Sequence, residues 1–381
     1  MTTTIACVVG ARPNFVKMGP ILLGLRAADA ELRPVLVHTG QHYDRAMSDQ
    51  FFAELELPAP DVHLEVGSGL QGEQTAKILA RYERFLLDAN PRPAATLVVG
   101  DVNSTLACAL ASVKLGVPVV HVEAGLRSFD RRMPEEINRV VTDAVSDLLL
   151  TSEPDGERNL RHEGRPEASV RFVGNVMIDV LLQRREEALA RDVPGRLGLP
   201  ASGYGVWTMH RPSNVDDPRQ LAAWASALGR IVRRLPIVFP VHPRTKGRLE
   251  AAGLWDELAA LPNLTLQPPL GYLDFLGLTA RCRLIVTDSG GLQEEAAALG
   301  IPCLTLRDTT ERPITVSEGT STLVGSDAAL LEELTDHVLR GSYKRTPPSL
   351  LWDGRAGERV GRETVAFLRS RESVASSRVA E

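Results

Sequence analysis

The sequence predicts an α/β protein made of two doubly wound domains that face a central cleft. Its 381 residues exceed what one ordinary domain contains and suffice for two domains, each with its own core. Short apolar runs typical of strands alternate with helix-forming segments in both halves, the pattern of a parallel sheet covered by helices. Polar residues follow most of these strands, where open parallel sheets bind their ligands, so we expect the ligand between the two domains.

The expected strands are short runs rich in valine, leucine and isoleucine. In the first half they lie at residues 5–9, 34–38, 95–100, 117–121, 147–151 and 170–173. In the second half they lie at residues 205–209, 236–239, 264–267 and 284–286. Helices are expected between them, because helix-type periodicity or strong helix formers follow many of the strands.

The domain boundary is expected near residue 174, before a polar, proline-containing stretch at residues 184–203 after which the strand and helix pattern restarts. This gives an N-terminal Rossmann-like domain of residues 1–173 and a C-terminal, nucleotide-binding Rossmann-like domain of residues 174–355. A helix at about 356–371 is expected to pack back on the first domain. Residues 372–381 are expected to form a disordered tail.

Composition excludes several classes of protein. Hydrophobic residues make up 44% of the chain, charged residues 24%, and the net charge of -5 provides no basic field for nucleic acid or an anionic membrane surface. The N-terminus lacks the pattern of a signal peptide, and no apolar run is long enough to span a bilayer. The four cysteines are scattered and predicted to be buried free thiols, which fits a reducing cytoplasm: Cys7, Cys108, Cys282 and Cys303.

Residues 287–302 join a buried strand, a glycine turn and a helix. Gly290 and Gly291 allow bare backbone N–H groups to approach a ligand, and residues 293–299 are strong helix formers. The first N–H groups of a helix lack internal partners and carry partial positive charge, so a phosphate fits there. The alternative is an ordinary helix start, capped by Asp288 or Ser289, which explains everything except the paired glycines.

Two acids follow in the first turns of this expected helix. Glu294 and Glu295 would repel a phosphate placed beside them, so at least one is expected to face elsewhere. A ribose diol is a suitable target, because a carboxylate accepts hydrogen bonds from both hydroxyls at once.

The turn after the first strand argues against a dinucleotide cofactor. It begins at Gly10 but lacks the second and third glycines of the dinucleotide fingerprint, and it offers the cations Arg12 and Lys17 instead. Those cations either face a ligand or are simply exposed on a loop and a helix. No spacing typical of a metal site occurs, and His121, inside a strand, is expected to be a satisfied core histidine. We therefore expect neither a metal nor another cofactor.

Acidic residues accumulate at the carboxyl ends of the first-half strands. Asp101 and Glu123 follow successive strands, and Glu135 lies at the start of the next helix on the same rim. One such acid is commonplace as a helix cap, whereas three acids interleaved with Arg127 and Arg139 are typical of general acid/base groups beside anion binders.

Eight segments together make the chain recognisable. They are Gly-Ala-Arg-Pro at 10–13, Gly-Asp at 100–101, His-Val-Glu-Ala-Gly-Leu-Arg at 121–127, Pro-Glu-Glu-Ile-Asn-Arg at 134–139, His-Arg at 210–211, Pro-Val-His-Pro at 240–243, Thr-Asp-Ser-Gly-Gly-Leu-Gln-Glu-Glu at 287–295 and Arg-Asp-Thr-Thr-Glu-Arg-Pro at 307–313. Over nearly its whole length the chain resembles the non-hydrolysing UDP-N-acetylglucosamine 2-epimerases, which have the two-domain GT-B fold.

The resemblance implies roles for individual residues. The family's catalytic groups align with Asp101, Glu123, Glu135 and His210. The implied substrate contacts are Arg12, Lys17, Arg139, His210, Ser289, Gly290 and Gly291 for the diphosphate, Glu295 for the ribose, Phe275 for the uracil, and His242 and Arg312 elsewhere in the site. The resemblance also implies a UDP-sugar substrate, a homodimer and no cofactor.

The chain departs from the family pattern in three places. Many members have glutamate where this chain has Asn14, and His-Arg-Arg-Glu-Asn where it has His-Arg-Pro-Ser-Asn at 210–214. In some bacterial relatives a second substrate molecule activates the enzyme near a Gln-His-Arg-x-Met segment, which differs here at residues 41–47. We therefore expect a distinct branch without that activation, in which the motifs indicate the type of reaction but do not specify the sugar.

The implied chemistry needs no redox cofactor. C2 of the sugar is not adjacent to a carbonyl, so removal of its proton alone would leave an unstabilised carbanion. If the anomeric C–O bond breaks and UDP leaves, loss of the C2 proton gives a neutral glycal, and re-addition of proton and UDP inverts C2. Carboxylates move the proton, and cations and helix N–H groups stabilise the leaving diphosphate.

Three alternatives remain at this stage. A hydrolysing 2-epimerase would release N-acetylmannosamine and UDP, and a GT-B glycosyltransferase would pass the sugar to an acceptor. A non-catalytic nucleotide-sugar binder would have no use for three acids on one rim.

Overall fold

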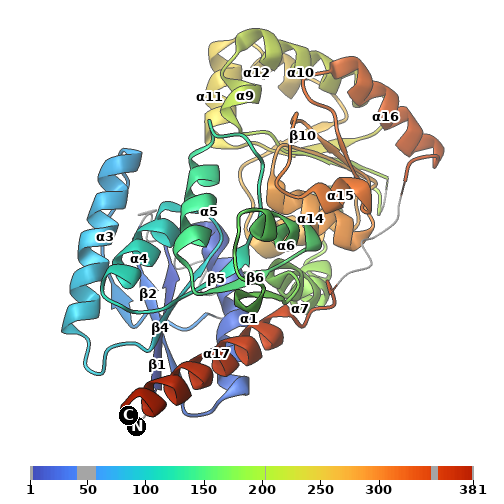
Figure 1. Ribbon diagram of the computed structural model, residues 1–381. Coiled ribbons are helices and arrows are strands. Elements are labelled where there is room, and N and C mark those ends of the chain that lie inside the picture. Colours follow the sequence, from blue (N-terminus) through green and yellow to red (C-terminus); the bar gives the residue numbers. More distant parts are fainter. Residues whose placement is uncertain (1–2, 41–56, 202, 345–350, 380–381) are drawn as a thin grey trace. The chain divides into compact units, whose positions relative to one another are not determined.

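The computed structural model describes residues 3–40, 57–201, 203–344 and 351–379 (Figure 1). The chain divides into two compact units: unit 1 comprises residues 1–180 and 350–381, and unit 2 comprises residues 181–349. The sequence placed the first boundary near residue 174, just before helix α7 (Val176–Ala190), whereas the division falls inside that helix. Residues 41–47, where the regulatory segment was expected to differ, lie outside the described residues.

Unit 1 contains, within its described residues, a seven-stranded parallel sheet of the order β3-β2-β1-β4-β5-β6-β7. The order reverses between β1 and β4, which is the doubly wound topology that the sequence predicted. Strand β3 was not predicted, because two residues are too few to show a periodic pattern. The strands are β1 (Thr3–Val9), β2 (Leu32–His38), β3 (Val62–His63), β4 (Ala95–Val99), β5 (Val119–Ala124), β6 (Leu148–Thr151) and β7 (Val170–Phe172).

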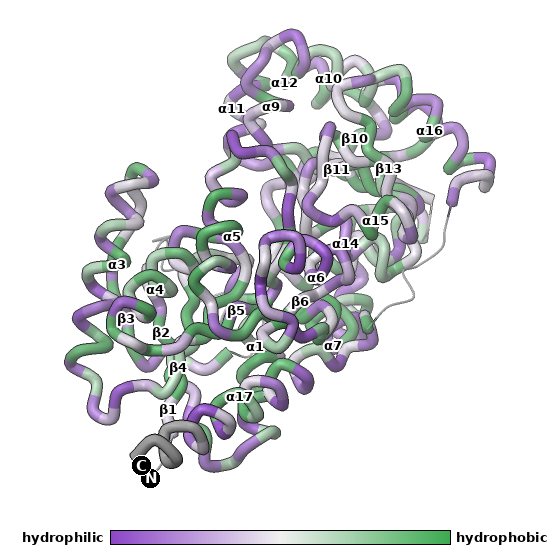
Figure 2. Tube along the Cα trace, viewed as in Figure 1, coloured by the Kyte–Doolittle hydropathy of each residue, from purple (hydrophilic) through white to green (hydrophobic). Residues whose placement is uncertain are grey.

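Amphipathic helices connect these strands. In α3 the buried residues Gln74, Ile78, Tyr82 and Leu86 recur every fourth position, so they share one face, while the residues between them are mostly hydrophilic (Figure 2). The helices of unit 1 are α1 (Arg12–Ala28), α3 (Gln71–Asp88), α4 (Asn103–Lys114), α5 (Pro134–Val145), α6 (Pro154–His162), the 3-10 turn η1 (Glu167–Ser169) and α17 (Ala356–Val379).

The C-terminal helix α17 packs along α1, although the two are far apart in sequence (Figure 1). Glycines allow the two backbones to touch: a Cβ on Gly24 would lie 1.8 Å from the Gly357 carbonyl oxygen, and one on Gly361 would lie 2.1 Å from that of Gly24. The side chain of Asp179 accepts hydrogen bonds from the Ala356 and Gly357 amides at 3.0 and 2.7 Å, which anchors the start of α17 to unit 1.

The expected disordered tail from residue 372 is wrong as far as Val379, because α17 continues through that segment. Residues 362–379 contain neither glycine nor proline, so nothing in the local sequence ends the helix where the expectation placed its end.

Unit 2 contains, in its described part, a six-stranded sheet of the order β10-β9-β8-β11-β12-β13, again parallel throughout. The order reverses between β8 and β11. Strands β12 and β13 were not predicted, although β8, also of three residues, was predicted as part of the run at 205–209. The strands are β8 (Gly205–Trp207), β9 (Ile237–Pro240), β10 (Leu264–Gln267), β11 (Leu284–Thr287), β12 (Cys303–Thr305) and β13 (Ser321–Leu323).

The helices of unit 2 cover this sheet and pack large apolar side chains such as Trp207, Trp224 and Phe239 against it. They are α8 (Val193–Arg196), α9 (Pro212–Val215), α10 (Pro218–Ile231), α11 (Pro243–Ala251), α12 (Trp255–Ala259), α13 (Tyr272–Thr279), α14 (Gly290–Leu299), α15 (Pro313–Ser317) and α16 (Ala328–Arg340).

All four cysteines are free and buried, as the sequence predicted. Among the helices of the described residues, none combines the length and the apolar character that a membrane crossing requires.

Candidate active site

The predicted site residues gather where each sheet reverses its strand order. In unit 1 this is the edge between β1 and β4, and in unit 2 the edge between β8 and β11. The connections after neighbouring strands diverge at such a point, so they leave room for a ligand beside the carboxyl ends of the strands. Asp101 follows β4, while His210 and Asp288 follow β8 and β11. Each unit therefore carries its own cluster.

Glu123 is held in a strained position at the end of β5. Its φ of 71° places a non-glycine residue in the left-handed region, and the pairing of β5 with β6 shifts register between Val122 and Ala124. The carboxylate forms a buried ion pair with Lys17 of α1. Strain of this kind persists only where surrounding contacts over-determine the backbone, and it is concentrated at functional sites.

Asp101 lies directly beside this ion pair. Gly100, at a φ of 70°, turns the chain after β4, and a Cβ on it would lie 3.4 Å from both Glu123 Oε2 and Lys17 Nζ. Asp101 accepts a hydrogen bond from Arg139 Nη2 at 2.5 Å and remains partly exposed. The structure thus brings together four predicted residues, two acids and two cations, on one rim of unit 1.

Asn14, where the chain departs from the family pattern, is also part of this rim. Its side-chain amide donates to the Val99 carbonyl oxygen at 2.7 Å, and its side-chain oxygen accepts from the Ala11 amide at 3.3 Å. A glutamate carboxylate has no hydrogen to donate to that carbonyl. Asparagine therefore ties the start of α1 to the end of β4.

The two neighbouring glutamates of α5 have different environments. Glu136 is buried and accepts hydrogen bonds from the Ser128 and Phe129 amides at 2.9 and 2.8 Å and from Arg139 at 2.8 Å. Burial alone would raise the pKa of Glu136, but these hydrogen bonds and the Arg139 charge outweigh it and lower the pKa. Glu135 is half-buried and makes no hydrogen bond or ion pair with the described part of the chain. Glu135 is therefore the acid of the two available to a substrate.

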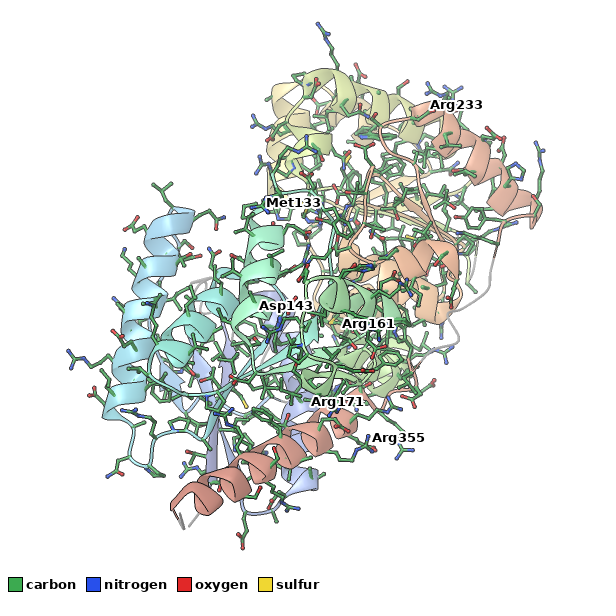
Figure 3. The ribbon with its side chains drawn as sticks, in the orientation of Figure 1. Met133, Asp143, Arg161, Arg171, Arg233 and Arg355 are labelled. Atoms are coloured by element: carbon green, nitrogen blue, oxygen red, sulfur yellow. The ribbon has the colours of Figure 1, made fainter. Side chains whose placement is uncertain are left out.

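Behind this rim, His121 is a satisfied core histidine, as predicted. It is fully buried, with Nδ1 2.6 Å from Asp143 Oδ1 and Nε2 2.9 Å from the Gly100 carbonyl oxygen. Asp143, labelled in Figure 3, also accepts from the Gly125 amide at 2.9 Å and pairs with Arg127 at 2.8 Å. Burial would raise the pKa of Asp143, but the charges and hydrogen bonds of His121 and Arg127 lower it.

In unit 2, Asp288 organises the turn that carries His210. It is fully buried, and its Oδ2 accepts from the His210 and Arg211 amides at 2.9 and 2.8 Å and from Asn214 Nδ2 at 3.0 Å. His210 Nδ1 lies 2.8 Å from the other carboxylate oxygen. Burial would raise the pKa of Asp288, but His210 and the two backbone amides lower it. A carboxylate at Nδ1 requires a proton there, so Nε2 is the nitrogen presented outward on a ring that is 42% exposed.

His242 lies close to His210, with 5.6 Å between ring centroids. It is the N-cap of α11, and its Nδ1 accepts from the Arg244 amide at 3.2 Å. The two histidines predicted from distant motifs therefore occupy one end of the unit 2 sheet.

The start of α14 has the features of an anion site. Ser289 is the N-cap residue, but its side chain makes no cap hydrogen bond. This argues against the alternative that the segment is only an ordinary helix start capped by Ser289. The two glycines differ: a Cβ on Gly290 would lie 2.2 Å from Glu311 Oε1, whereas a Cβ on Gly291 would meet nothing within 4 Å. A side chain at position 290 would displace the Glu311 carboxylate, whereas the space beside Gly291 is open.

Two predicted binders of unit 2, Arg312 and Glu295, are buried. Arg312 Nε lies 3.1 Å from Glu294, and both side chains are buried, so Glu294 is the acid that faces away from a ligand at the helix start. Glu295 is buried near Tyr272, where burial and the Glu295 charge raise the tyrosine pKa. Phe275, predicted beside the uracil, is only partly buried and packs against the core of unit 2.

Arg12 begins α1, as its motif predicted, but its side chain lies outside the described atoms. Sequence reasoning did not identify Asp143 or Glu136 and assigned Asp288 only to helix capping. Each fixes backbone amides of a neighbouring turn, and no local pattern marks such a contact; the one available signal for Asp288 was its position before the glycine pair. No cluster of three or more potential metal ligands occurs among the described residues.

Comparison with known proteins yields one family. Residues 26–363 match the family model described as UDP-N-acetylglucosamine 2-epimerase. The UDP-N-acetylglucosamine 2-epimerase of Methanocaldococcus jannaschii is 40% identical over 363 residues, which cover 94% of this chain and 98% of that protein. The UDP-2,3-diacetamido-2,3-dideoxy-D-glucuronate 2-epimerase of Pseudomonas aeruginosa is 40% identical over 360 residues, with 93% and 98% covered. The crystal structure of the M. jannaschii enzyme in complex with UDP-GlcNAc and UDP aligns with a TM-score of 0.86 at 39% identity, covering 96% of this chain and 100% of that one.

Proposed function

This chain belongs to the UDP-N-acetylglucosamine 2-epimerase family, and we propose that it inverts C2 of UDP-N-acetylglucosamine, or of a closely related UDP-2-acetamido sugar, by eliminating and re-adding UDP. The observation that carries the proposal is the rim of unit 1, where Asp101, Glu123, Lys17 and Arg139 meet. Two acids held by two cations beside a strand reversal suit proton transfer next to a departing anion.

The elimination requires one group to take the C2 proton while the C1–O bond breaks toward UDP. We assign that proton to the unit 1 acids Asp101, Glu123 and Glu135. Glu123 is ion-paired with Lys17, and Asp101 with Arg139, so each of these acids has a cation beside it. Re-addition requires a second acid, protonated from solvent, on the opposite face of C2. It gives its proton to C2 as UDP attacks C1, the first acid releases to solvent the proton that it took, and the configuration is inverted.

Unit 2 is proposed to hold the nucleotide. The uncapped start of α14 at Ser289 and Gly291 would receive the diphosphate, because its free N–H groups and the helix dipole favour an anion. His210, oriented by Asp288, would present Nε2 to the diphosphate or its leaving oxygen. Glu295 would bind the ribose, and the region of Phe275 the uracil, as the family resemblance implies.

The assay follows the fate of C2. UDP-N-acetylglucosamine and UDP-2,3-diacetamido-2,3-dideoxy-D-glucuronate are each incubated with the protein in heavy water and followed by NMR. We expect inversion at C2 with deuterium incorporated there, and traces of free glycal and UDP. Release of free N-acetylmannosamine with UDP would indicate a hydrolysing enzyme. UDP release with C2 and its hydrogen unchanged would indicate a glycosyltransferase.

The assembly and domain roles are further parts of the proposal. The family resemblance supports a homodimer, and the charge and cysteine pattern supports a cytoplasmic enzyme. An N-terminal catalytic domain joined by the C-terminal helix, with a C-terminal nucleotide-binding domain, fits the two units. Light scattering of the purified protein measures the first of these properties.

A further inference from the structure

The two turns that bear the unit 1 acids converge on one buried pair that the reaction itself does not use. Asp143 and His121 have no exposed surface, so neither contacts a substrate. Both nevertheless bond to backbone groups immediately beside Asp101 and Glu123.

His121 fixes the turn before Asp101. Its Nε2 is 2.9 Å from the Gly100 carbonyl oxygen, and because a carbonyl only accepts, Nε2 must carry a hydrogen and donate it. The Gly100 amide donates in turn to the Val122 carbonyl oxygen at 3.1 Å. Both backbone polar groups of this left-handed glycine are therefore tied to strand β5, and Asp101 is the next residue.

Asp143 fixes the segment around Glu123. Its Oδ1 faces His121, two residues before Glu123, and its Oδ2 accepts from the Gly125 amide, two residues after it. The same oxygen pairs with Arg127, whose guanidinium is also held by Glu163 at 2.6 Å. Gly125 packs directly against the Gly156 backbone, because a Cβ there would lie 2.3 Å from the Gly156 carbonyl oxygen. The Asp143 carboxylate therefore holds the chain both before and after Glu123, whose backbone is left-handed.

We propose that Asp143 and His121 are positioning residues that hold Asp101 and Glu123 at a fixed separation for proton transfer at C2. This rests on the proposed function. A strained backbone such as that of Glu123 persists only where several contacts hold it, and these hydrogen bonds are such contacts. The His121 ring connects the two turns, because one of its nitrogens contacts Asp143 and the other contacts the Gly100 carbonyl oxygen.

A matched pair of substitutions at His121 separates its two contacts. The side-chain amide nitrogen of asparagine reaches about as far as Nδ1, and that of glutamine about as far as Nε2. His121→Asn keeps the hydrogen bond to Asp143 and loses the one to Gly100, whereas His121→Gln does the reverse. Small displacements of reacting groups lower turnover by roughly a hundredfold. We expect His121→Asn to lower kcat roughly a hundredfold with KM nearly unchanged, and His121→Gln to stay within about tenfold of wild type.

Asp143→Asn is a second, conservative variant. Its oxygen can accept from Gly125 and Arg127, while its amide donates to Nδ1 of a neutral His121 that still donates from Nε2 to Gly100. We expect kcat within about tenfold of wild type, since every backbone contact survives. A hundredfold loss in folded Asp143→Asn would overturn the proposal, as would equal kcat values for the two His121 variants.

Hydrogen exchange tests the same network without any assay of activity. The Gly100 and Gly125 amides should be strongly protected in wild type, and the Gly100 amide should exchange faster in His121→Asn than in His121→Gln. Equal protection in the two variants would overturn the proposal even if the wild type epimerises its substrate. Wild type that fails to exchange the C2 hydrogen would instead contradict the proposed function, leaving the amide measurement to decide the network. If His121→Asn does not fold, Asp143→Asn and the wild-type amide protection carry the test.

Discussion

Each unit contains a buried aspartate that faces a histidine, and the two pairs differ in what lies on the far side of the ring. His121 of unit 1 is fully enclosed, and its second nitrogen is used by the Gly100 carbonyl oxygen. His210 of unit 2 is 42% exposed, and its second nitrogen faces outward. In both, the carboxylate fixes the ring and backbone amides of the adjacent turn. The pair itself is therefore a scaffold, and whether the histidine does chemistry depends on the exposure of its second nitrogen.

The largest effect should come from the acids that the enclosed pair holds. Asp101→Asn and Glu123→Gln are nearly isosteric, and each removes a group that moves or positions a proton. We expect kcat to fall roughly a hundredfold or more in each variant, with thermal stability close to that of wild type. NMR of C2 deuteration gives the rate and differential scanning calorimetry the stability. Wild-type rates in both variants would reject the acid/base assignment.

The adjacent glutamates of α5 provide an internal control. Glu135→Gln should lower kcat by a similar factor without loss of stability, because Glu135 bonds to nothing in the described chain. Glu136→Gln keeps one acceptor oxygen but places its amide hydrogens either against the Phe129 amide or against the Ser128 amide and Arg139, at a cost of about 1–3 kcal/mol in unfolding free energy. Urea titration and turnover measured together should give opposite patterns. A reversed pattern would make Glu136 the reacting acid.

The same aspartate substitution should have different effects in the two pairs. In Asp288→Asn the oxygen must stay on the three donors at Oδ2, so the amide faces His210 Nδ1 and forces the proton onto Nε2. That change removes a lone pair from the exposed nitrogen. If Nε2 accepts a proton in the reaction, kcat falls roughly a hundredfold or more, as a misplaced histidine proton does in other dyads.

Calorimetric titration with UDP distinguishes the two roles of His210. Preserved UDP affinity together with preserved kcat would mean that Nε2 only donates to the diphosphate, because the tautomer of this variant still carries a hydrogen on Nε2. The comparison with Asp143→Asn is the control, because the same tautomer already suits the enclosed pair. Equal losses in the two variants would contradict the distinction between an enclosed and an exposed histidine.

The sequence predicted the site residues at the strand ends better than it predicted the buried residues that hold them in place. Polar residues after apolar strands are visible in one dimension, so Asp101, Glu123, His210 and the glycine pair were found at the correct strand ends. Strands β3, β12 and β13, of two or three residues, escaped because so short a run shows little periodicity, whereas β7 and β8, equally short in the structure, were predicted within runs of four and five residues. The end of α17 was misplaced, since nothing in the local sequence separates an unpacked tail from a helix.

The supporting residues could not be predicted for a different reason. Asp143 bonds to residues 22 and 18 positions earlier, and Asp288 to residues more than 70 positions earlier. Such contacts are set by which strands pair and in which register, and no local motif encodes them. The same limit explains why the sequence could not distinguish Gly290 from Gly291, although Glu311 from a later segment fills the space beside Gly290 alone.

A smaller effect is expected at the helix start of unit 2. Gly291→Ala adds a methyl group in open space, so it should not disturb packing, but it should weaken UDP binding about tenfold by hindering approach to the helix N–H groups. Gly229→Ala in α10, also with room for a Cβ, is the control and should leave affinity unchanged. Calorimetry with UDP measures both. Unaltered affinity in Gly291→Ala would restore the interpretation of α14 as an ordinary helix.

The smallest effect concerns a buried aspartate without a histidine. Asp179 accepts two backbone hydrogen bonds at the start of α17, yet burial raises its pKa to about 6, against 3.8 ordinarily. A carboxyl whose pKa is raised on folding stabilises the protein at low pH and loses that contribution as pH rises through 6. Asp143 and Asp288 differ from Asp179 in the histidine that faces each of them and, at Asp143, in Arg127, and these groups lower the carboxyl pKa.

His38, in the same unit, changes the stability of the protein with pH in the opposite direction. Burial lowers its pKa to about 4, so the unfolded chain binds more protons below pH 6.5 and His38 removes stability as pH falls. Between pH 7 and pH 5 the two groups oppose each other. In Asp179→Asn only the histidine contribution remains, so the melting temperature should fall more on acidification than in wild type, by the equivalent of about 1–2 kcal/mol. In His38→Gln it should rise instead. Calorimetric melts at pH 5 and pH 7 measure the change of melting temperature with pH in each variant. An identical change in the two variants would show that neither group titrates in this range.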